Sequence, residues 1–571
     1  MTEGNLTLDI LDLVARDPDN ISLRRRVDGE WTDITIGQFH DEVVAAAKGL
    51  VALGVQPGAR VAIMSKTRYE WTLLDYAIWF AGAVTVPIYE TSSDAQVQWI
   101  LADSEATHVF VETDQHEAEV ARARNETPAV VHVGRVTDAD GSLVEAGKDV
   151  PDSELEARRA TLTEDSLATL IYTSGTTGRP KGCELTHGNF RAELADALEV
   201  LPELFGDEDG NTLLFLPLAH VFARIVQIGT LRSGATLGHT ADIADLVEHL
   251  GEFKPTYILA VPRVFEKVFN SASAKAYGEG KGKIFDKAAK TAIEFSRAQD
   301  AGKVGLGLKA RHALFNKLVY GKLRAALGGR TKYAISGGAA LGDRLGHFYR
   351  GIGVTILEGY GLTETTAALT VNTVDHLKVG TVGRPFPRTE VRVAEDGELQ
   401  FRGPQVFRGY WQNPDATAQV LDAEGWFSSG DIGEIDEDGF VKITGRKKEL
   451  IVTAGGKNVA PAVLEDRIRA HKYVSQCLVV GEGKPFIAAL ITVDTEMWDG
   501  PLDDPELLAS LQEAIDDANT QVSRAESIRK FEILPQDWTE QNGYLTPSFK
   551  VKRHAVLRDH HDLVESLFVK G

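Results

Sequence analysis

Residues able to grip a polyphosphate lie close together near position 175. The run Tyr172–Gly182 reads Tyr-Thr-Ser-Gly-Thr-Thr-Gly-Arg-Pro-Lys-Gly, in which hydroxyl side chains alternate with glycines. Glycine lets the backbone turn its N–H groups towards an anion, the hydroxyls add donors, and Lys181 adds a positive charge. The run departs from the Walker pattern G-x-x-x-x-G-K-[ST], because Pro180 stands five residues after Gly175. We predict a phosphate-binding loop of another type, against the alternative of a surface loop rich in turn formers.

The loop needs secondary structure on both sides to hold it in place. The apolar run Leu167–Ile171 predicts a short buried strand that leads into the loop. After the loop, Thr186–Asn189 can start a helix that continues through Leu194 and Leu198. We therefore predict an ordered loop between a strand and a helix.

Strand patterns alternate with helical patterns along most of the chain, which predicts an α/β fold of sheets covered by helices. Helical patterns include Trp71–Phe80. The predicted strands are Arg60–Met64, Ala83–Ile88, His108–Val111, Ala129–Val133, Leu213–Leu216, Tyr257–Val261, Tyr333–Ser336 and Val354–Leu357. The last two lead into Gly337–Ala340 and Glu358–Thr365. Glycines and polar groups beyond the carboxyl end of a strand lie where open α/β sheets bind ligands.

The pattern changes twice towards the C-terminus. From Gly380 to Ile443 short β segments are broken by Gly, Pro and Asp, which predicts a β-rich subdomain. The charged run Gly445–Glu449 then precedes a new apolar strand, Leu450–Val452. We place the domain boundary here, giving a large N-terminal domain, residues 1–445, and a smaller α+β domain, residues 446–571.

The length and composition of the chain limit the classes of protein to which it can belong. A chain of 571 residues should hold two or more domains, and 43% apolar with 25% charged residues is ordinary for a globular protein. The two cysteines, Cys183 and Cys477, cannot form a disulfide framework, so we expect buried thiols and a reducing, cytoplasmic compartment. The N-terminus has no basic region typical of a signal peptide. The most apolar segment, Leu73–Ile88, is too short and too broken to span a bilayer.

Charge is distributed unevenly. The net charge of −22 argues against nucleic acid as a partner. Residues 254–332, however, hold 17 Lys and Arg against 5 Asp and Glu, a local balance of +12. Such a cluster is a solvated helical face, a patch for the phosphates of a nucleotide-like substrate, or a patch for anionic phospholipid. The last would place the protein peripherally at the inner face of a membrane.

Five motifs, taken together, resemble one superfamily. In order they are Thr173–Gly182, Tyr360–Glu364, Gly425–Asp431, Gly445–Arg446 and Leu545–Lys550. Over nearly the whole chain they resemble the adenylate-forming (AMP-binding) superfamily of acyl- and aryl-CoA synthetases. The segments Thr67–Trp71, Val86–Tyr89, Leu216–Val221 and Ala260–Lys267 are most similar to long-chain fatty acid–CoA ligases.

The resemblance implies a reaction in two steps. A fatty acid carboxylate attacks the α-phosphate of ATP, giving an acyl-adenylate and pyrophosphate. The thiol of coenzyme A then displaces AMP to give a thioester. In the first step two anions meet, so cations and N–H donors must neutralise the charge that builds up on the phosphate oxygens.

The resemblance also assigns residues. Lys550 is the candidate catalytic lysine of the first step, against the alternative of an ordinary lysine in a basic run; Glu364 would organise Mg²⁺ with Thr173, and Thr363 would reach the α-phosphate. His220 would lie near the reacting carboxylate, although a histidine after an apolar strand is more often a core residue. Nucleotide contacts are expected from Thr173, Ser174, Gly175, Thr176, Thr177, Gly178, Lys181, Gly338, Ala339, Glu358, Gly359, Tyr360, Gly361, Asp431 and Arg446.

Within that set, Tyr360 would stack on adenine and Asp431 would accept hydrogen bonds from the ribose hydroxyls. Ser429 replaces the threonine common in the family and keeps its hydroxyl. The second step is expected to follow rotation of the C-terminal domain about Lys448, which would bring Lys457 towards the site in a phosphate or coenzyme A role. A rigid linker is the alternative.

Three functions are compatible with these observations. The first is a long-chain fatty acid–CoA ligase. The second is a fatty acyl-AMP ligase that loads a carrier protein; the chain shows no carrier domain, which favours coenzyme A. The third is a catalytically silent lipid- or nucleotide-binding protein, which the intact Lys550, Glu364 and Asp431 disfavour.

Overall fold

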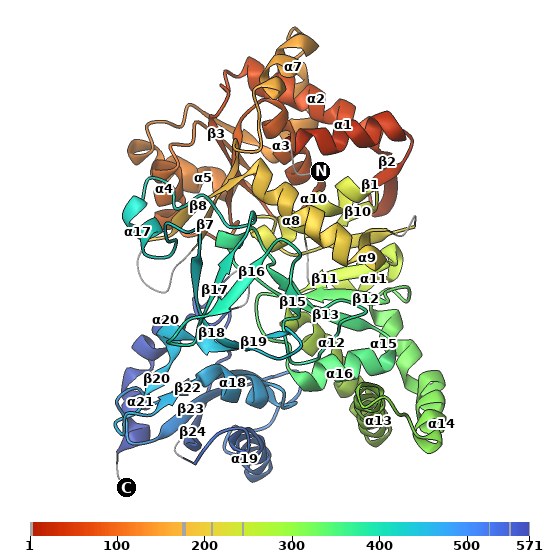
Figure 1. Cartoon of the computed structure of the whole chain (residues 1–571), viewed down its shortest axis with the longest axis vertical. Helices are drawn as coiled ribbons and strands as arrows, with labels where there is room; N and C mark the ends of the chain where they lie inside the picture. The colour runs from red at the N-terminus through yellow and green to blue at the C-terminus, as the bar shows by residue number, and fades with distance from the viewer. Residues whose placement is uncertain are drawn as a thin grey trace.

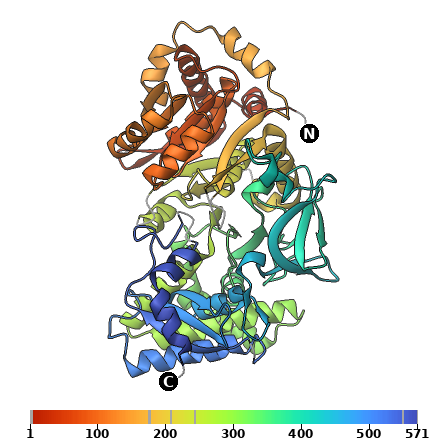
Figure 2. The same cartoon turned by 90° about the vertical axis from the view of Figure 1, so that its left-hand side faces the viewer.

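Six sheets form within the part of the chain that the computed structural model describes, which is residues 4–173, 179–206, 209–241, 245–524, 526–546 and 550–569. Four of them, with their helices, lie before Lys447, and the other two follow it. The N-terminal elements gather at one end of the molecule and the C-terminal elements at the other (Figures 1 and 2). The α/β fold class predicted from the sequence is confirmed.

The largest sheet carries the strand that leads into the phosphate loop. Its order is β6-β5-β3-β4-β7-β8, with the first five strands parallel. Their bounds are β3 Arg60–Met64, β4 Val84–Ile88, β5 His108–Val111, β6 His132–Arg135, β7 Leu167–Thr173 and β8 Lys181–Thr186. The strand predicted at Ala129–Val133 starts three residues before β6 starts and ends two residues before β6 ends. The predicted helix start at Thr186–Asn189 is confirmed, but strand β8, which pairs antiparallel with β7 between the loop and that helix, was not predicted.

The helix that follows β8 begins where the sequence placed it. In α8, His187–Val200, the Thr186 hydroxyl accepts a hydrogen bond from the backbone N–H of Asn189, and the Asn189 side chain accepts one from the Thr186 N–H. This reciprocal cap satisfies two N–H groups that have no partner within the helix. The loop therefore joins the two strands of a β-hairpin, and α8 follows directly after the second strand.

A second sheet carries the glycine-containing segments that follow two of its strands. Its order is β11-β12-β13-β14-β15, with β11 Tyr257–Ala260, β12 Tyr333–Ser336 and β13 Thr355–Tyr360 parallel, and β14 Thr370–Val371 and β15 Arg384–Pro385 antiparallel. The sequence had predicted all three parallel strands. Their carboxyl ends present the Gly337–Ala340 and Gly361–Glu364 segments on the same edge of the sheet.

The remaining sheets complete the frame. An N-terminal sheet, β2-β1-β10-β9, joins β1 Ile21–Val27 and β2 Glu30–Thr35 to β9 Asn211–Leu214 and β10 Thr236–His239. An antiparallel sheet, β16-β17-β18-β19, comprises β16 Glu390–Val393, β17 Glu398–Arg402, β18 Phe427–Ile435 and β19 Val441–Arg446. This is the predicted β-rich subdomain. Its longest strand, β18, was missed as a strand because it coincides with the Gly425–Asp431 motif.

The C-terminal elements have hydrophobic cores of their own. Helices α18 Pro461–Arg469 and α19 Pro505–Asn519 pack with strands β22 Val474–Val480, β23 Ile487–Val493 and β24 Ile528–Leu534. A short pair, β20 Ile451–Val452 and β21 Asn458–Val459, precedes them, and α20 Arg553–Asp559 and α21 His561–Phe568 end the chain. None of the helices in the described ranges is both long and apolar enough to cross a membrane.

Helix α3, Tyr69–Phe80, is buried at every residue. A helix without a polar face must lie in a core, and α3 also brings a carboxylate there. Asp75 accepts hydrogen bonds from Arg224 at 2.6 and 3.2 Å, from Thr85 at 2.7 Å and from Gln227 at 3.2 Å. The side chains of Asp75 and Arg224 are both 0% exposed. Arg224 lies on α10, Val221–Ser233, so the pair fixes α10 against α3.

Because a buried charge that loses its partner is left without water, we expect Asp75→Ala to destabilise the fold by about 3–5 kcal/mol. The control is Asp33→Ala, which breaks the exposed Arg24–Asp33 pair and should cost at most about 1 kcal/mol. Thermal unfolding of both variants measures the difference. Equal midpoints for the two variants would contradict the importance of the buried pair.

Candidate active site

The turn after β13 is fixed by close backbone contacts. A Cβ atom added to Gly361 would lie 1.4 Å from the carbonyl oxygen of Ala367, so only glycine fits there. Thr366 and Ala367 have positive φ values of 59° and 113°, which side-chain-bearing residues rarely adopt. Thr363 and Glu364 are therefore held in a short 3-10 helix, Thr363–Thr365, on a turn that has little freedom to shift.

Asp431, a residue of β18, is bonded to side chains from β13 and β19 next to this turn. Tyr360, the last residue of β13, donates its hydroxyl hydrogen bond to Asp431 Oδ2 at 2.5 Å. Arg446 Nε lies 3.0 Å from Asp431 Oδ1, and the two residues face each other across β18 and β19. Burial raises the pKa of Asp431, whereas Arg446 opposes that rise. A carboxylate can accept about four hydrogen bonds, so Asp431 can still accept from a ligand.

The Ser429 hydroxyl fixes the backbone that carries the Asp431 side chain. It donates to the carbonyl of Leu399 at 2.7 Å and accepts from the Asp431 N–H at 3.1 Å. One side of the Tyr360 ring packs near Phe401, with centroids 5.7 Å apart. The β-rich sheet therefore orients both Asp431 and Tyr360.

Lys550 reaches the same group of charges from near the C-terminus. The charged residues that affect its pKa are Arg446, Asp431, Glu364 and Glu449. Surrounding protein atoms lower its pKa most, Arg446 lowers it further, and the three carboxylates oppose the change. The side chain remains accessible to solvent. The preceding Pro547, Ser548 and Phe549 lie outside the described residues.

Burial and, to a smaller extent, the positive charge of nearby Lys550 lower the pKa of His220 to about 3. His220 caps α10, and its Nδ1 accepts a hydrogen bond from the Phe222 N–H at 3.2 Å. The imidazole is therefore neutral at physiological pH and carries its proton on Nε2. It can donate one hydrogen bond towards the site.

The Lys181 end of the phosphate loop is connected to Glu364 through a tyrosine. Thr173 faces Lys181 across the β7–β8 pair. Lys181 Nζ lies 4.3 Å from the centroid of the Tyr410 ring, and the Tyr410 hydroxyl donates to Glu364 Oε1 at 2.8 Å. Ser174, Gly175, Thr176, Thr177 and Gly178 lie outside the described residues. Tyr410 was missed from the sequence, and only its place after Gly409 in a Gly-aromatic-aromatic run could have pointed to it.

The thiol of Cys183 belongs to β8, the second strand of this hairpin. Its Sγ is 3.9 Å from the Thr173 hydroxyl oxygen, and the residue is 0% exposed. Burial raises the pKa of this thiol and also that of Cys477, the other cysteine of the chain. Both are thus the buried thiols that the sequence predicted.

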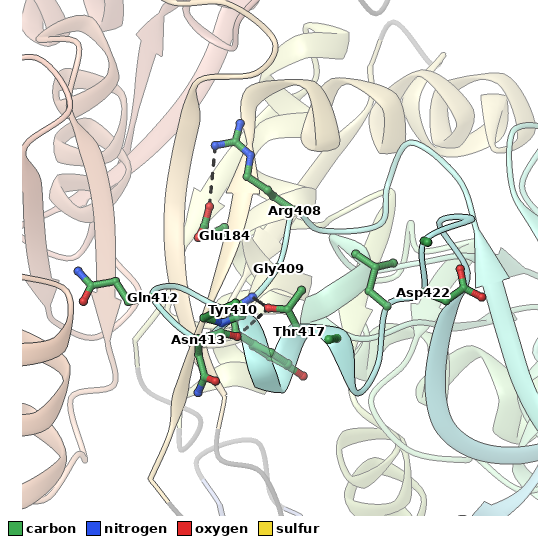
Figure 3. Close-up of a pocket in the computed structure, with 12 residues that line it drawn as sticks. Glu184, Arg408, Gly409, Tyr410, Gln412, Asn413, Thr417 and Asp422 are labelled. Carbon is green, nitrogen blue, oxygen red and sulfur yellow. Dashed lines mark hydrogen bonds and ion pairs between the residues drawn. The ribbon is translucent and has the colours of Figure 1, made fainter.

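A cavity of about 470 Å³ has Tyr410 among its lining residues (Figure 3). Glu184, Arg408 and Thr417 are among its lining residues, and the Thr417 hydroxyl accepts a hydrogen bond from the Tyr410 N–H at 2.9 Å. The cavity therefore shares Tyr410 with the site but not the charged group around Asp431.

The predicted nucleotide residues on the second sheet take different positions. Gly338 and Ala339 are exposed after β12, with Gly338 at φ +83°. Gly359 is half-buried in β13. Glu358 is buried, and its Oε2 accepts from the Leu341 N–H at 3.1 Å; burial raises its pKa to about 7. The Glu358 carboxylate thus fixes the Gly338–Leu341 segment.

Lys457 is not part of the group around Lys550. Its Nζ lies 3.3 Å from Glu526 Oε1, and its backbone bonds with Thr453 within the β20–β21 turn. The described contacts thus place Lys457 within the C-terminal part of the chain, away from the charged group that contains Lys550.

Two family models match the chain: AMP-binding enzyme over residues 12–411, and AMP-binding enzyme C-terminal domain over residues 448–571. The chain belongs to the AMP-binding enzyme family. This AMP-binding enzyme is 52% identical, over 97% of its length and 95% of theirs, to the proteins named long-chain-fatty-acid–CoA ligase FadD15 of Mycobacterium bovis and Mycobacterium tuberculosis. It is 29% identical to long-chain-fatty-acid–CoA ligase ACSBG2 of Xenopus laevis, over 96% of this chain and 82% of that one. The resemblance read from the motifs is confirmed.

Solved structures share the fold of this AMP-binding enzyme. The adenylation domain of a carboxylate reductase from Mycobacterium chelonae matches with a TM-score of 0.77 and 22% identity, over 99% of this chain and 91% of that one. ATP-bound MatB from Rhodopseudomonas palustris matches with a TM-score of 0.73 and 24% identity, over 98% and 99% of the two chains.

The raised pKa of Glu358 has a consequence for stability. A carboxyl group whose pKa is about 7 in the folded protein and 4.5 when unfolded binds its proton more tightly in the folded state. Its contribution to stability is complete below pH 4.5 and is lost as the pH rises through 7. We therefore expect Glu358→Gln to gain stability relative to the wild type between pH 4.5 and pH 8, by up to about 3 kcal/mol.

Thermal unfolding of both proteins across this pH range measures that gain. Glu395→Gln, at an exposed position, is the control and should follow the wild type. A stability difference between Glu358→Gln and the wild type that is constant with pH would refute the prediction.

Proposed function

We propose that this AMP-binding enzyme is a long-chain fatty acid–CoA ligase, which converts ATP, a fatty acid and coenzyme A into acyl-CoA, AMP and pyrophosphate through an acyl-adenylate. One observation carries the proposal. Lys550, Asp431 and Glu364 come from distant parts of the chain, yet the charges of Asp431 and Glu364 act on Lys550, and the charge of Lys550 acts on the neutral His220. The fatty acid is proposed from the 52% identity to FadD15.

The first step requires a carboxylate to approach a triphosphate. The fatty acid oxygen forms a bond to the α-phosphorus, and the bond to pyrophosphate breaks. Lys550 would stabilise the charge on the α-phosphate oxygens, and Thr363 would donate a hydrogen bond to them. A cation that is partly shielded from water acts more strongly on a nearby anion than one in bulk solvent.

The other phosphates would lie at the hairpin. Lys181 and the Thr173 hydroxyl stand at the two ends of the phosphate loop, and Glu364 reaches the same place through Tyr410. Glu364 and Thr173 supply oxygen ligands, which Mg²⁺ prefers, so the residues present fit a magnesium ion. When bound, Mg²⁺ would neutralise phosphate charge.

The nucleoside would be held at the junction of β13 with the β-rich sheet. Asp431 would accept hydrogen bonds from the ribose hydroxyls, and Arg446 would donate to ribose or phosphate. Tyr360 and the backbones of Gly338, Ala339, Gly359 and Gly361 would enclose adenine. Glu358 contributes by holding the Gly338–Leu341 segment, as its bond to the Leu341 N–H indicates.

The acyl chain would enter beside His220. Its Nε2–H can donate to the carboxylate and later to the carbonyl oxygen of the adenylate. Phe222 and Val261 lie against the Gly337–Gly338 backbone, so their apolar side chains would border the acyl group. The position of His220 next to Lys550 supports this placement.

In the second step a different face of the C-terminal domain must approach the adenylate. In this structure the charges of Asp431 and Glu364 act on Lys550, whereas Lys457 is paired with Glu526. This arrangement suits adenylate formation. We propose that residues 446–571 form a domain that rotates about Lys448, so that Lys457 replaces Lys550 and coenzyme A can attack the adenylate carbonyl carbon, with AMP as the leaving group.

AMP release tests the function. Purified protein, ATP, Mg²⁺ and a panel of saturated fatty acids should release AMP when coenzyme A is added, most rapidly with long chains. Faster transfer to a phosphopantetheinyl carrier protein than to coenzyme A would favour the acyl-AMP ligase. Absence of fatty acid-dependent pyrophosphate release would indicate a binding protein and overturn the proposal.

The two half-reactions should respond differently to loss of Lys550. We expect Lys550→Ala to slow adenylate formation about 10²–10³-fold, the usual effect of removing one group that stabilises a transition state. Thioester formation from preformed acyl-adenylate and coenzyme A should be largely retained. Lys552→Ala, two residues away in the same basic run, is the matched control. Equal losses in both half-reactions would remove Lys550 from its assigned role.

We also propose a membrane contact within the basic segment. Helix α14, Leu306–Phe315, has no buried residue and lies at the edge of the molecule in Figure 1. Leu306, Leu314 and Leu318 are 84%, 54% and 54% exposed and are spaced by multiples of four. Exposed Lys309, Lys317 and Lys322 accompany them. Apolar side chains among lysines fit the surface of an anionic membrane, where fatty acids partition.

Sedimentation with vesicles measures this contact. The wild type should bind phosphatidylglycerol vesicles more tightly than phosphatidylcholine vesicles, and Leu306→Asp with Leu314→Asp should weaken that binding at least about tenfold, because each burial of an apolar side chain is lost. Val131→Asp, at a 66% exposed apolar position elsewhere, is the control. Equal binding to both vesicle types, or to neither, would count against the contact.

A further inference from the structure

One face of α12 contacts the C-terminal part of the chain. This helix, Pro262–Gly278, begins within the Ala260–Lys267 segment singled out in the sequence. Arg263 Nη2 donates to the Ser475 hydroxyl oxygen at 3.0 Å, and its Nη1 donates to the Ser475 carbonyl at 3.4 Å. Lys267 Nζ lies 3.6 Å from Glu496 Oε1. Positions four apart share a side of a helix, so Arg263 and Lys267 present one surface.

The partner of Arg263 is itself held by a partly buried network of hydrogen bonds. The Ser475 hydroxyl donates to Asp537 Oδ2 at 2.6 Å, and Thr492 donates to Asp537 Oδ1 at 2.6 Å. Arg263 is thereby linked to a carboxylate through one hydroxyl, and such a chain of bonds is polarised along its length. Arg263 also favours the ionised form of Asp494. Arg263 thus reaches one carboxylate of the C-terminal part through Ser475 and acts electrostatically on a second.

A second arginine makes a parallel contact. Arg344, on α16 Asp343–Ile352, donates through Nη2 to the carbonyl of Ala470 at 2.8 Å. Ala470 caps the C-terminus of α18, where carbonyl groups favour a cation. The same guanidinium lies over the Phe269 ring of α12, 4.8 Å from its centroid. Arg344 is therefore packed between α12 and α18.

We propose that Arg263, supported by Arg344, is a latch that holds the C-terminal domain in the arrangement in which Lys550 reaches the nucleotide. Both contacts occur while Lys550 lies beside Asp431 and Glu364. Because Ser475, Ala470 and Lys550 belong to the same domain, a rotation that brings Lys457 forward must break both contacts. Arg263 is thus a positioning residue for the first half-reaction. This inference rests on the proposed function.

Separate half-reaction assays of Arg263→Ala test the latch. Pyrophosphate release from ATP and fatty acid should slow about tenfold, which corresponds to about 1.4 kcal/mol. Thioester formation from preformed acyl-adenylate and coenzyme A should match or exceed that of the wild type. Arg263→Lys, which keeps the charge without the planar fork, should lose less. Lys275→Ala removes an exposed cation from the same helix and serves as the control.

Hydrogen exchange gives a readout that does not need activity. Amides of residues 470–476 should exchange faster in Arg263→Ala than in the wild type, and should not do so in Lys275→Ala. Equal losses in the two half-reactions, unchanged adenylation or unchanged exchange would each overturn the latch. A wild-type protein that forms no adenylate would instead refute the proposed function, and hydrogen exchange would still decide whether Arg263 holds the domain.

Discussion

The Asp431 carboxylate is the point on which the arrangement of the site depends. Tyr360 and Arg446 bind its two oxygens, so one buried side chain ties the end of β13 to both β18 and β19. Burying such a charge is costly unless hydrogen bonds and an opposite charge compensate. The sheets must therefore meet at this place, and the groups that would surround a nucleotide are set by the same contacts that stabilise the fold.

Local sequence patterns were sufficient to predict many of the strands and one helix cap. Strands such as Arg60–Met64 and Tyr333–Ser336 were predicted with correct bounds, because short apolar runs between turn-forming residues have few other structures available. The cap at Thr186 could likewise be predicted, because it depends only on residues that are close in the sequence. The motif residues Glu364, Asp431, Arg446 and Lys550 were assigned by resemblance, and the structure brings all four together.

Features that depend on distant partners could not be predicted. The residues of β8 become a strand only by pairing with β7, and Tyr410 matters only because its hydroxyl meets Glu364. The sequence marked Ala260–Lys267 as distinctive but did not indicate that Arg263 would contact Ser475, more than two hundred residues later. Nor could it show that Lys457 pairs with Glu526 while the charges of Asp431 and Glu364 act on Lys550.

The burial of Cys183 bears on the chemical selectivity of a site that handles activated acyl groups. An acyl-adenylate is an electrophile, and a thiolate is the side chain most prone to capture it. Cys183 lies next to the phosphate hairpin, yet it is fully covered and its pKa is raised, and Cys477 is similarly protected. An incoming substrate thiol would thus meet the intermediate without an internal competitor, and the protein would resist both self-acylation and mixed disulfide formation with that substrate.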